Sequence, residues 1–365
     1  MRTTVAVVNG PGQDFALEEV ELEGPRADEV LVRVVATGLC HTDVTMASML
    51  PAEMYPHVFG HEGAGVVEAV GPDVAGIEVG DHVVLSFRSC RQCDRCRAGE
   101  VGYCESSLLL NYMGMRMDGS TAYSRDSGPV FSHFFGQSSF SRHALAYADN
   151  CVVVDRELDL TRVAPYGCGF QTGAGTVLNV LRPGPGDSLV VWGAGAVGLA
   201  AVAAAATTGT GTVVAVDLVA DRLERAAALG AVTVDPSTPG EQPVVDRVKE
   251  LTGGGATYGI DTTAVPAVVK QAQQALGVRG ELVVLGLGAE EYQLDAIDML
   301  QNGKVVKGSI EGDSDPQEMV PRLIAMNAAG SFPVDDWIRT YSFEDIGTAV
   351  ADLHDGRVVK AVLVW

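Results

Sequence analysis

The sequence predicts an α/β protein with two domains, a β-rich domain followed by a domain built on a parallel sheet. Its 365 residues are enough for two domains of ordinary size. Through the first 150 residues apolar and polar positions alternate, as in Glu29–Val35, and Gly and Pro often interrupt the pattern. From Ser188 onward, apolar segments alternate with Ala-rich stretches. This alternation indicates parallel strands with helices on both faces of the sheet.

The second domain should contain four buried strands with helices between them. The strands are expected at Ser188–Trp192, Thr212–Val216, Gly259–Asp261 and Glu281–Leu285, and the helices at Leu199–Thr207 and Ala220–Leu229. The apolar segment Glu281–Leu287 is expected at the edge of the sheet, where it would invite pairing with a second copy. Lys360–Val364 should form a further strand, and the Gly- and Ser-rich segment Ser106–Ser141 a surface loop or a pocket lid.

Composition and charge argue against several classes of function. A net charge of −22 disfavours a nucleic-acid partner, because the phosphate backbone would be repelled. No uninterrupted apolar run of about 20 residues occurs, so no membrane span is expected. The segment Met1–Val8 resembles a strand more than a signal peptide, and a cytoplasmic location is therefore expected.

A dinucleotide-binding motif follows the first strand of the second domain. The motif, G-x-G-x-x-G, is Gly193-Ala194-Gly195-Ala196-Val197-Gly198. Its glycines allow a tight turn, close approach of a pyrophosphate and close packing of the next helix, whose first amides would meet the negative charge. Asp217 ends the following strand, where a carboxylate would bind ribose hydroxyls and favour NAD over NADP. The alternative is an ordinary glycine turn with a capping aspartate.

Four of the seven cysteines lie within one short segment. They are Cys90, Cys93, Cys96 and Cys104. Four thiolates at this spacing can surround a tetrahedral Zn²⁺, and with every position filled by protein the zinc would be structural. An iron–sulfur cluster, which also uses four cysteines, is the main alternative, and chance clustering of reduced cysteines is the weaker one.

A second metal site is suggested by residues that are individually unremarkable. Cys40 and Cys168 could each be a buried thiol, and His61 could be a hydrogen-bonded histidine in a loop. Together they offer two thiolates and one imidazole, with a fourth position open for solvent or substrate. The remaining cysteine, Cys151, is expected to be a buried thiol.

These motifs together make the sequence resemble the zinc-containing medium-chain alcohol dehydrogenases, and most closely their aryl (benzyl) alcohol dehydrogenase branch. The family likeness lies in Gly38–Asp43, Gly60–Gly71, Cys90–Cys104, Gly167–Gly175, Gly193–Gly198, Asp217 and Gly356–Lys360. The likeness to the branch lies in Phe134–Phe140, Gly169–Gly175 and Glu311–Ser314. The resemblance implies a GroES-like catalytic domain over 1–169 and 312–365, a Rossmann NAD-binding domain over 170–311, and two Zn²⁺ per chain with NAD as cofactors.

The resemblance also implies roles for single residues. Cys40, His61 and Cys168 would hold the catalytic zinc, with Asp43 hydrogen-bonded to His61 and the Glu62 carboxylate close to the metal. The Cys₂His ligand set of alcohol dehydrogenase is a known one. The Thr42 hydroxyl would lie nearest the alcohol and accept its proton.

Further positions implied by the resemblance surround the cofactor and the substrate. His41 and Lys360 would contact the cofactor pyrophosphate, and Arg222 the adenosine ribose. Where many relatives carry a relay histidine this chain has Thr45, so the proton must continue through ribose hydroxyls, water or another base. Ser86 replaces an aromatic residue of the pocket wall and leaves room for a bulky alcohol. Apolar residues that could line the pocket are Leu108, Leu109, Leu110, Tyr112, Met113, Met115 and Met117.

The expected function is therefore the reversible oxidation of a primary, aromatic or allylic alcohol to its aldehyde by a homodimer or homotetramer, with a small molecule as its substrate. Two alternatives stay open at this point. One is a formaldehyde dehydrogenase acting on a thiol adduct, although no residue here identifies a thiol-cofactor site. The other is a non-catalytic NAD-binding or redox-sensing protein, which would not need every zinc ligand.

Overall fold

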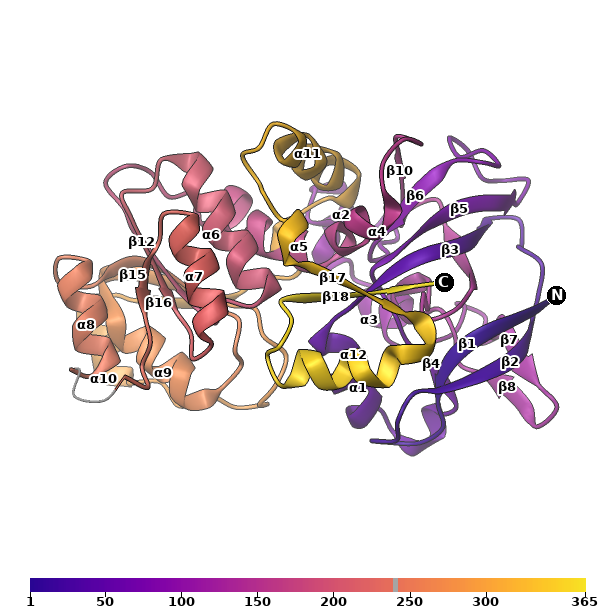
Figure 1. The fold of residues 1–365 in the computed structure, drawn as a ribbon, viewed down its shortest axis with the longest axis horizontal. Coiled ribbons are helices and arrows are strands. Elements are labelled where there is room, and N and C mark those ends of the chain that lie inside the picture. Colours follow the sequence, from indigo (N-terminus) through magenta and orange to yellow (C-terminus); the bar gives the residue numbers. More distant parts are fainter. Residues whose placement is uncertain (239–241) are drawn as a thin grey trace. The chain divides into compact units, whose positions relative to one another are not determined.

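The computed structural model describes residues 1–238 and 242–365 and divides the chain into two compact units (Figure 1). The first unit comprises Met1–Cys168, Asp315–Ala325 and Asp335–Trp365, and the second Gly169–Ser314 and Met326–Val334. The domain boundaries at 169/170 and 311/312 stay predictions. No helix of the described residues is both long enough and apolar enough to cross a lipid bilayer.

The first unit is built on two mainly antiparallel sheets. One sheet has the order β4 (His57–Val58), β1 (Arg2–Val8), β2 (Ala16–Leu22), β7 (Tyr123–Arg125) and β8 (Gly128–Val130). The other has the order β10 (Cys151–Val154), β6 (His82–Leu85), β5 (Gly63–Val70), β3 (Glu29–Leu39), β18 (Lys360–Val364) and β17 (Ile338–Ser342), with β9 (His143–Tyr147) also paired to β3. β17 and β18 run parallel, and β18 is antiparallel to β3.

Short helices connect these strands. The α-helices of the first unit are α1 (His41–Met49), α2 (Asp94–Arg97), α3 (Ser107–Asn111), α4 (Leu160–Val163) and α12 (Ile346–His354), and α11 (Pro316–Ala328) begins in it. Its 3₁₀ turns are η1 (Ala52–Met54), η2 (Val101–Tyr103), η3 (Phe134–Gly136), η4 (Ala164–Gly167), η7 (Asp335–Trp337) and η8 (Phe343–Asp345).

β3 is the central strand of this unit, and its composition explains why. Val30 and Val32 alternate with residues on the opposite face, and they pack with Val67 of β5 and Leu85 of β6 in one apolar cluster. Because β3 is covered on both faces, its polar ends need partners inside the protein.

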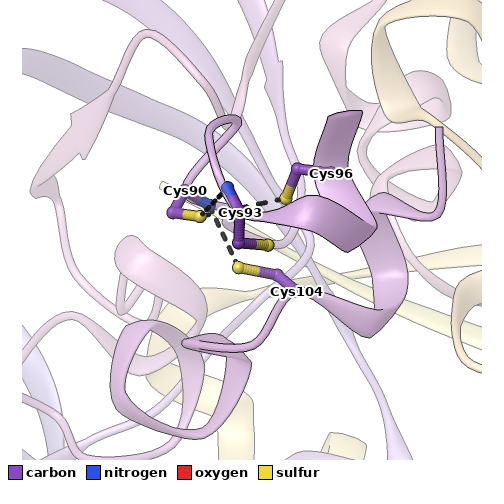
Figure 2. Close-up of side chains that lie close together, drawn as sticks. All are labelled: Cys90, Cys93, Cys96 and Cys104. Atoms are coloured by element: carbon purple, nitrogen blue, oxygen red, sulfur yellow. Dashed lines mark hydrogen bonds between the residues drawn. The ribbon is translucent and has the colours of Figure 1, made fainter. Parts of the chain in front are cut away.

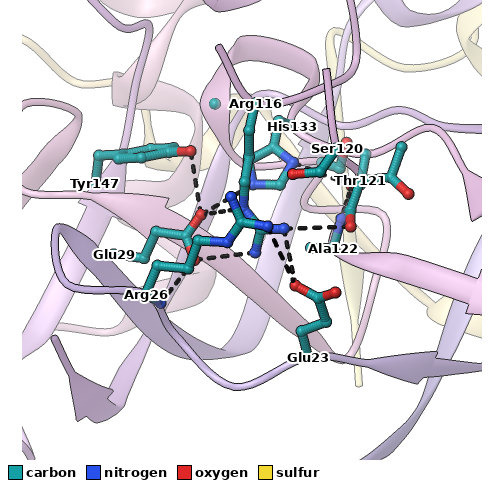
Figure 3. Close-up of polar contacts among 12 residues, drawn as sticks. Glu23, Arg26, Glu29, Arg116, Ser120, Thr121, Ala122, His133 and Tyr147 are labelled. Carbon is teal, nitrogen blue, oxygen red and sulfur yellow. Dashed lines mark hydrogen bonds and ion pairs between the residues drawn. The ribbon is translucent and has the colours of Figure 1, made fainter. Parts of the chain in front are cut away.

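An ion pair at the start of β3 provides such partners (Figure 3). Arg116 Nη2 donates to Glu29 Oε2 at 3.0 Å, and the Tyr147 hydroxyl donates to Glu29 Oε1 at 3.2 Å. Burial alone would raise the pKa of Glu29, but hydrogen bonds from His133 and Arg116 outweigh it and hold that pKa well below its usual range. The pair anchors the segment that follows the cysteine cluster to β3.

That segment, Ser106–Ser141, was predicted to be a surface loop or a lid. The prediction is wrong for the C-terminal part of this segment, because residues 132–141 are all buried and include η3, whereas Leu108, Leu109 and Met117 nearer its start are exposed. The many Gly and Ser residues serve tight turns within a buried region, and sequence composition does not distinguish this from an exposed loop.

The second unit is a Rossmann-type domain, and the predicted fold class is confirmed. Its six parallel strands have the order β13 (Val232–Val234), β12 (Thr212–Val216), β11 (Ser188–Trp192), β14 (Ala256–Asp261), β15 (Leu276–Val284) and β16 (Val305–Gly308). Its helices are α5 (Gly169–Gly175), α6 (Ala196–Thr208), α7 (Ala220–Ala228), α8 (Val244–Leu251), α9 (Pro266–Ala275) and α10 (Ala296–Asn302), with a π-helical turn η5 (Thr176–Leu181) and a 3₁₀ turn η6 (Glu311–Asp313).

One prediction about this sheet is wrong. The strand that contains Glu281 does not lie at the edge, because β16 pairs with β15 in parallel, with Glu281 opposite Val305. Only four residues, Val305–Gly308, form β16, and a run this short carries too little periodicity to be recognised in the sequence. The edge on this side of the sheet is therefore β16, and β13 forms the other edge.

Candidate active site and metal centres

The four clustered cysteines form one group in the first unit (Figure 2). One sulfur from each of Cys90, Cys93, Cys96 and Cys104 lies within 4.8 Å of the others. The Cys90 amide donates to Cys104 Sγ at 3.2 Å, and the Cys93 amide to Cys90 Sγ at 3.3 Å. Amides donating to a sulfur stabilise the thiolate, and those of Cys96 and Glu105 lower the pKa of Cys93 to about 6. This set fits a closed tetrahedral Zn²⁺.

A second group brings together residues from three distant segments of the first unit. Cys40 precedes α1, His61 and Glu62 lie between β4 and β5, and Cys168 follows η4. One ligand atom from each of these four residues lies within 4.8 Å of the others. Cys40, His61 and Cys168 are the three residues that the resemblance assigned to one metal.

The chemistry of this group fits a zinc ion. The His61 ring is fully buried, and in the described part of the chain its Nε2 atom has no hydrogen-bond partner. A hydrogen bond with Cys168 and the positive charges of His61 and Lys360 hold the pKa of Cys40 well below its usual range, although burial opposes them. A buried imidazole nitrogen with no partner, next to a thiol that readily ionises, is a donor set suited to Zn²⁺.

Asp43 holds two of these ligands in place. Its Oδ1 lies 2.7 Å from His61 Nδ1 and accepts from the Gly60 amide at 3.0 Å, and its Oδ2 accepts from the Cys40 amide at 3.1 Å. With Nδ1 engaged by a carboxylate, Nε2 is the nitrogen directed at the cysteines. The structure therefore brings Asp43 to His61 as the resemblance implied.

Glu62 has a partner that the sequence analysis missed. Lys360 Nζ donates to Glu62 Oε1 at 2.6 Å and to the Leu39 carbonyl at 3.3 Å, and Lys360 is 2% exposed. Burial raises the pKa of Glu62 to about 7, although Lys360 opposes it. A side chain at Gly38 would clash with Glu62 Oε2, since its Cβ would lie 1.9 Å away. The contact of Lys360 with a cofactor pyrophosphate stays a prediction.

The remaining residues predicted around the metal lie at the start of α1. His41 is exposed, and Thr42 and Thr45 are half-buried on the first turns of this helix. Thr42 lies in the first turn of α1 and follows the N-cap residue Cys40 by two positions in the sequence. The catalytic role of Thr42 and the cofactor contact of His41 stay predictions.

The glycine motif of the second unit has the geometry that a dinucleotide site needs. Gly193 has φ +88°, a conformation that favours glycine, and a Cβ at Gly198 would lie 1.9 Å from the Gly193 carbonyl. A Cβ at Gly195, the N-cap of α6, would meet nothing within 4 Å, so the backbone is open to a ligand there. Ala196 and Val197 begin α6.

Asp217 lies directly after β12 and already accepts two amides. The Ala194 amide donates to its Oδ2 at 2.6 Å and the Val219 amide to its Oδ1 at 2.8 Å, and Arg222 Nη1 lies 3.8 Å from Oδ2. These contacts fix the carboxylate against the glycine turn. The binding of ribose hydroxyls by Asp217 and Arg222 stays a prediction.

The first unit also contains an apolar cavity of about 400 Å³. It is lined by Met46, Leu50, Pro51, Met54, Leu108, Tyr112 and Met113. Two aromatic rings connect the cavity to the metal ligand His61, because Tyr112 of the lining packs on Phe135 with centroids 5.2 Å apart, and Phe135 packs on His61 at 4.6 Å.

The predicted pocket residues are only partly correct. Leu108, Tyr112 and Met113 line the cavity, whereas Leu110 packs on the clustered cysteines. The other four lining residues were not predicted, since their apolar spacing also fits core packing; they are Met46, Leu50, Pro51 and Met54. Ser86 does not line the cavity, because it is fully buried and its hydroxyl donates to the Gly167 carbonyl at 2.6 Å.

Comparison with known proteins identifies the family. Residues 26–155 match the alcohol dehydrogenase GroES-like domain, and residues 196–327 the zinc-binding dehydrogenase family. A geraniol dehydrogenase of Castellaniella defragrans is 41% identical over 364 residues, which cover 99% of this chain and 97% of the relative.

Two crystal structures resemble the whole chain. The benzyl alcohol dehydrogenase of Acinetobacter calcoaceticus is 39% identical with a TM-score of 0.94, and a Burkholderia ambifaria protein described as an alcohol dehydrogenase zinc-binding domain protein is 43% identical with a TM-score of 0.93. Each match covers 100% of this chain and 99% of the other. The chain therefore belongs to the zinc-dependent medium-chain alcohol dehydrogenases, and this membership, with its two groups of ligands, supports zinc and NAD as cofactors.

Proposed function

We propose that this chain oxidises primary alcohols with a large apolar body, aromatic or allylic, to the aldehyde, reversibly and with NAD as hydride acceptor. The observation that carries the proposal is the cavity that Tyr112 and Phe135 connect to His61, whose lining is almost entirely apolar. A volume of about 400 Å³ accommodates a ring or a branched chain. The apolar lining disfavours a substrate that carries a charged group on this part. The geraniol and benzyl alcohol dehydrogenases among the relatives support the same substrate class.

In this proposal Cys40, His61 and Cys168 hold the catalytic zinc, and Asp43 fixes the His61 ring. Zinc, when bound, lowers the pKa of an alcohol, and NAD takes up the hydride. The Thr42 hydroxyl would accept the alcohol proton and pass its own proton on, through ribose hydroxyls, water or another base, towards solvent. The Phe135 ring, which packs on His61, would limit the access of water to the metal site and so strengthen the electrostatic contacts of the reacting oxygen.

The cofactor would lie on the second unit's glycine turn. The Gly193–Gly198 turn would hold its pyrophosphate at the start of α6, and Asp217 and Arg222 its adenosine ribose. His41 and Lys360 would add contacts to the pyrophosphate.

A kinetic comparison of benzyl alcohol, geraniol and ethanol with NAD tests the substrate class. We expect kcat/KM for both larger alcohols to exceed that for ethanol by about tenfold or more, because each buried methylene contributes to transition-state binding. A preference for ethanol would refute the proposal. Formaldehyde with and without glutathione or mycothiol tests the thiol-adduct alternative in the same assay.

A cavity-filling variant makes this test specific. Leu50→Trp should lower kcat/KM for geraniol about tenfold and leave the value for ethanol within about threefold. Leu109→Trp is the matched control, because Leu109 is 49% exposed and does not line the cavity. Equal losses with both alcohols would show that the cavity does not select the substrate.

We also propose that the chain forms a homodimer or homotetramer in which β16 meets a second copy. Val278, Ile297 and Leu300, near this edge, are 76%, 67% and 83% exposed, and Val305 of β16 is 39% exposed. An apolar edge strand favours pairing. Val305→Lys should lower the mass measured by light scattering, whereas Val79→Lys, at an exposed residue of the first unit, should not.

A further inference from the structure

We infer that Gln137 is a positioning residue that holds the backbone at and directly after the zinc ligand His61, an inference that rests on the zinc role proposed above. The Gln137 amide group donates to the His61 carbonyl at 3.0 Å and to the Ser86 carbonyl at 3.0 Å. Its Oε1 accepts from the Gly63 amide, also at 3.0 Å. The side chain is 1% exposed, so all three contacts form away from solvent.

The same contacts extend towards another ligand. The Ser86 hydroxyl donates to the carbonyl of Gly167, which precedes Cys168. Gln137 and Ser86 therefore connect the backbones next to His61 and Cys168 through one chain of hydrogen bonds. Asp43 connects Cys40 to the His61 ring from the opposite direction. For each of the three proposed ligands, a buried polar side chain therefore forms a hydrogen bond with the ligand's own backbone or with that of the preceding residue.

The backbone around Gln137 is strained in a way that fits such a role. Phe135 and Ser138 have φ values of +51° and +48°, which non-glycine residues rarely adopt. Asn150 Nδ2 donates to the Phe135 carbonyl at 3.0 Å and stabilises this turn. The turn places the Phe135 ring on the His61 imidazole, with centroids 4.6 Å apart. Strain of this kind persists where surrounding contacts fix one conformation, and it is frequent at functional sites.

The consequence is a defined orientation of His61 Nε2. Asp43 fixes the ring through Nδ1, but the position of the whole residue depends on the backbone that Gln137 holds. Loss of the Gln137 amide would leave the carbonyl of His61 and the amide of Gly63 to find other partners in a buried region. The Ser86 carbonyl would keep the bond from Asn150. Outer contacts of this kind commonly change metal affinity or activity by about 10–100-fold.

The test compares zinc release from wild type, Gln137→Met and Gln273→Met holoenzymes. Gln273 is also a fully buried glutamine, but it contacts Asp295 and Asp298 in the second unit. We expect Gln137→Met to release the zinc of the Cys40 site to a chelator at least about tenfold faster. The zinc of the four-cysteine site provides an internal reference, since its release should not change in either variant.

Cobalt substitution gives a second measurement that does not depend on turnover. The visible ligand-field spectrum of cobalt at the Cys40 site should change in Gln137→Met and stay as in wild type in Gln273→Met. Wild-type release and an unchanged spectrum in Gln137→Met would overturn the inference.

Ser86→Ala covers the case in which Gln137→Met does not fold. It removes only one hydroxyl, and it should accelerate release from the Cys40 site by a smaller factor than Gln137→Met. Unchanged release in Ser86→Ala would then count against the hydrogen-bond chain. If the wild-type protein bound only about one zinc per chain, the proposed function would be refuted. Gln137 would then have no zinc ligand to position.

Discussion

The two groups of metal ligands are assembled in opposite ways. Cys90, Cys93, Cys96 and Cys104 lie in one short segment, and the amides of that segment itself donate to their sulfurs (Figure 2). The group of Cys40, His61, Glu62 and Cys168 comes from three segments, and two further side chains, Asp43 near Cys40 and Gln137 of a fourth segment, hold it in place. The first group can close around a metal alone, whereas the second requires the folded sheet.

This difference separates a structural role from a chemical one. Four thiolates leave a tetrahedral ion no position for substrate. The second group has two thiolates, one imidazole and a carboxylate already engaged by Lys360, next to an apolar cavity. Substitutions in the two groups should therefore change different measured quantities, with turnover sensitive to one and stability to the other.

The largest effect is expected from His61→Ala. Removal of the imidazole should lower kcat/KM for benzyl alcohol at least about 1,000-fold, equivalent to about 4 kcal/mol of barrier, because a donor of the chemical site is lost. The thermal midpoint should fall little by comparison, and NAD binding, measured by fluorescence titration, should persist. A near-normal rate would show that the group containing His61 is not the chemical site.

Cys96→Ser should have the opposite signature. Loss of one ligand should reduce the zinc content from about two to about one per chain and lower the thermal midpoint by on the order of 5–10 °C. At a temperature where the variant is folded, kcat for benzyl alcohol should stay within about threefold of wild type. A loss of turnover as large as in His61→Ala would show that the two groups are not independent.

Asp43→Asn tests how strongly zinc binding by the second group depends on the Asp43 carboxylate that contacts the His61 ring. The amide keeps the size of the side chain but loses the charge that orients His61, so zinc affinity and kcat/KM should each fall about 10–100-fold. Metal competition and steady-state kinetics measure the two quantities. Full zinc occupancy with unchanged kinetics would show that the His61 ring needs no charged partner.

The smallest effect concerns His57, a second buried histidine four residues before His61. It stacks on Phe59 at 4.4 Å, and burial lowers its pKa to about 4, although a contact with the Met54 carbonyl opposes this. A histidine whose pKa is lower in the folded state stabilises the fold fully above its usual pKa of 6.5, and this stability is lost as pH falls towards 4.

The free energy of unfolding should therefore be about 2 kcal/mol lower at about pH 5 than at about pH 8 on account of His57. In His57→Phe, which keeps an aromatic ring on Phe59 and has no charge to acquire, this part of the pH dependence should vanish. Denaturant titrations at the two pH values measure it, and an equal slope in both proteins would contradict the assignment.

Local patterns in the sequence predicted the parts of the molecule that local forces determine. β11, β12 and β18 have the predicted bounds, because each consists of one polar residue followed by four apolar residues. The short strand β16 was missed, and with it the true edge of the sheet. The spacing of Cys90 to Cys104 predicted their grouping because the chain between them is too short to separate them.

Contacts between distant segments were harder to predict. Cys40, His61 and Cys168 were grouped only through the family resemblance, since no periodicity relates them. The pairing of Lys360 with Glu62 and the contacts of Gln137 depend on which buried side chain faces which backbone group after folding. Single polar residues inside buried segments carry no signal of this kind, so the structure was needed to find them.

The Glu62–Lys360 contact also has a consequence for biosynthesis. These residues are 298 positions apart in the chain, so at about 5–20 residues per second the ribosome needs about 15–60 s to produce the second after the first. β18, which carries Lys360, pairs with β3 only after this delay. The Cys90–Cys104 segment is complete early in translation, whereas the contact of Lys360 with Glu62, next to Cys40, can form only once β18 has emerged.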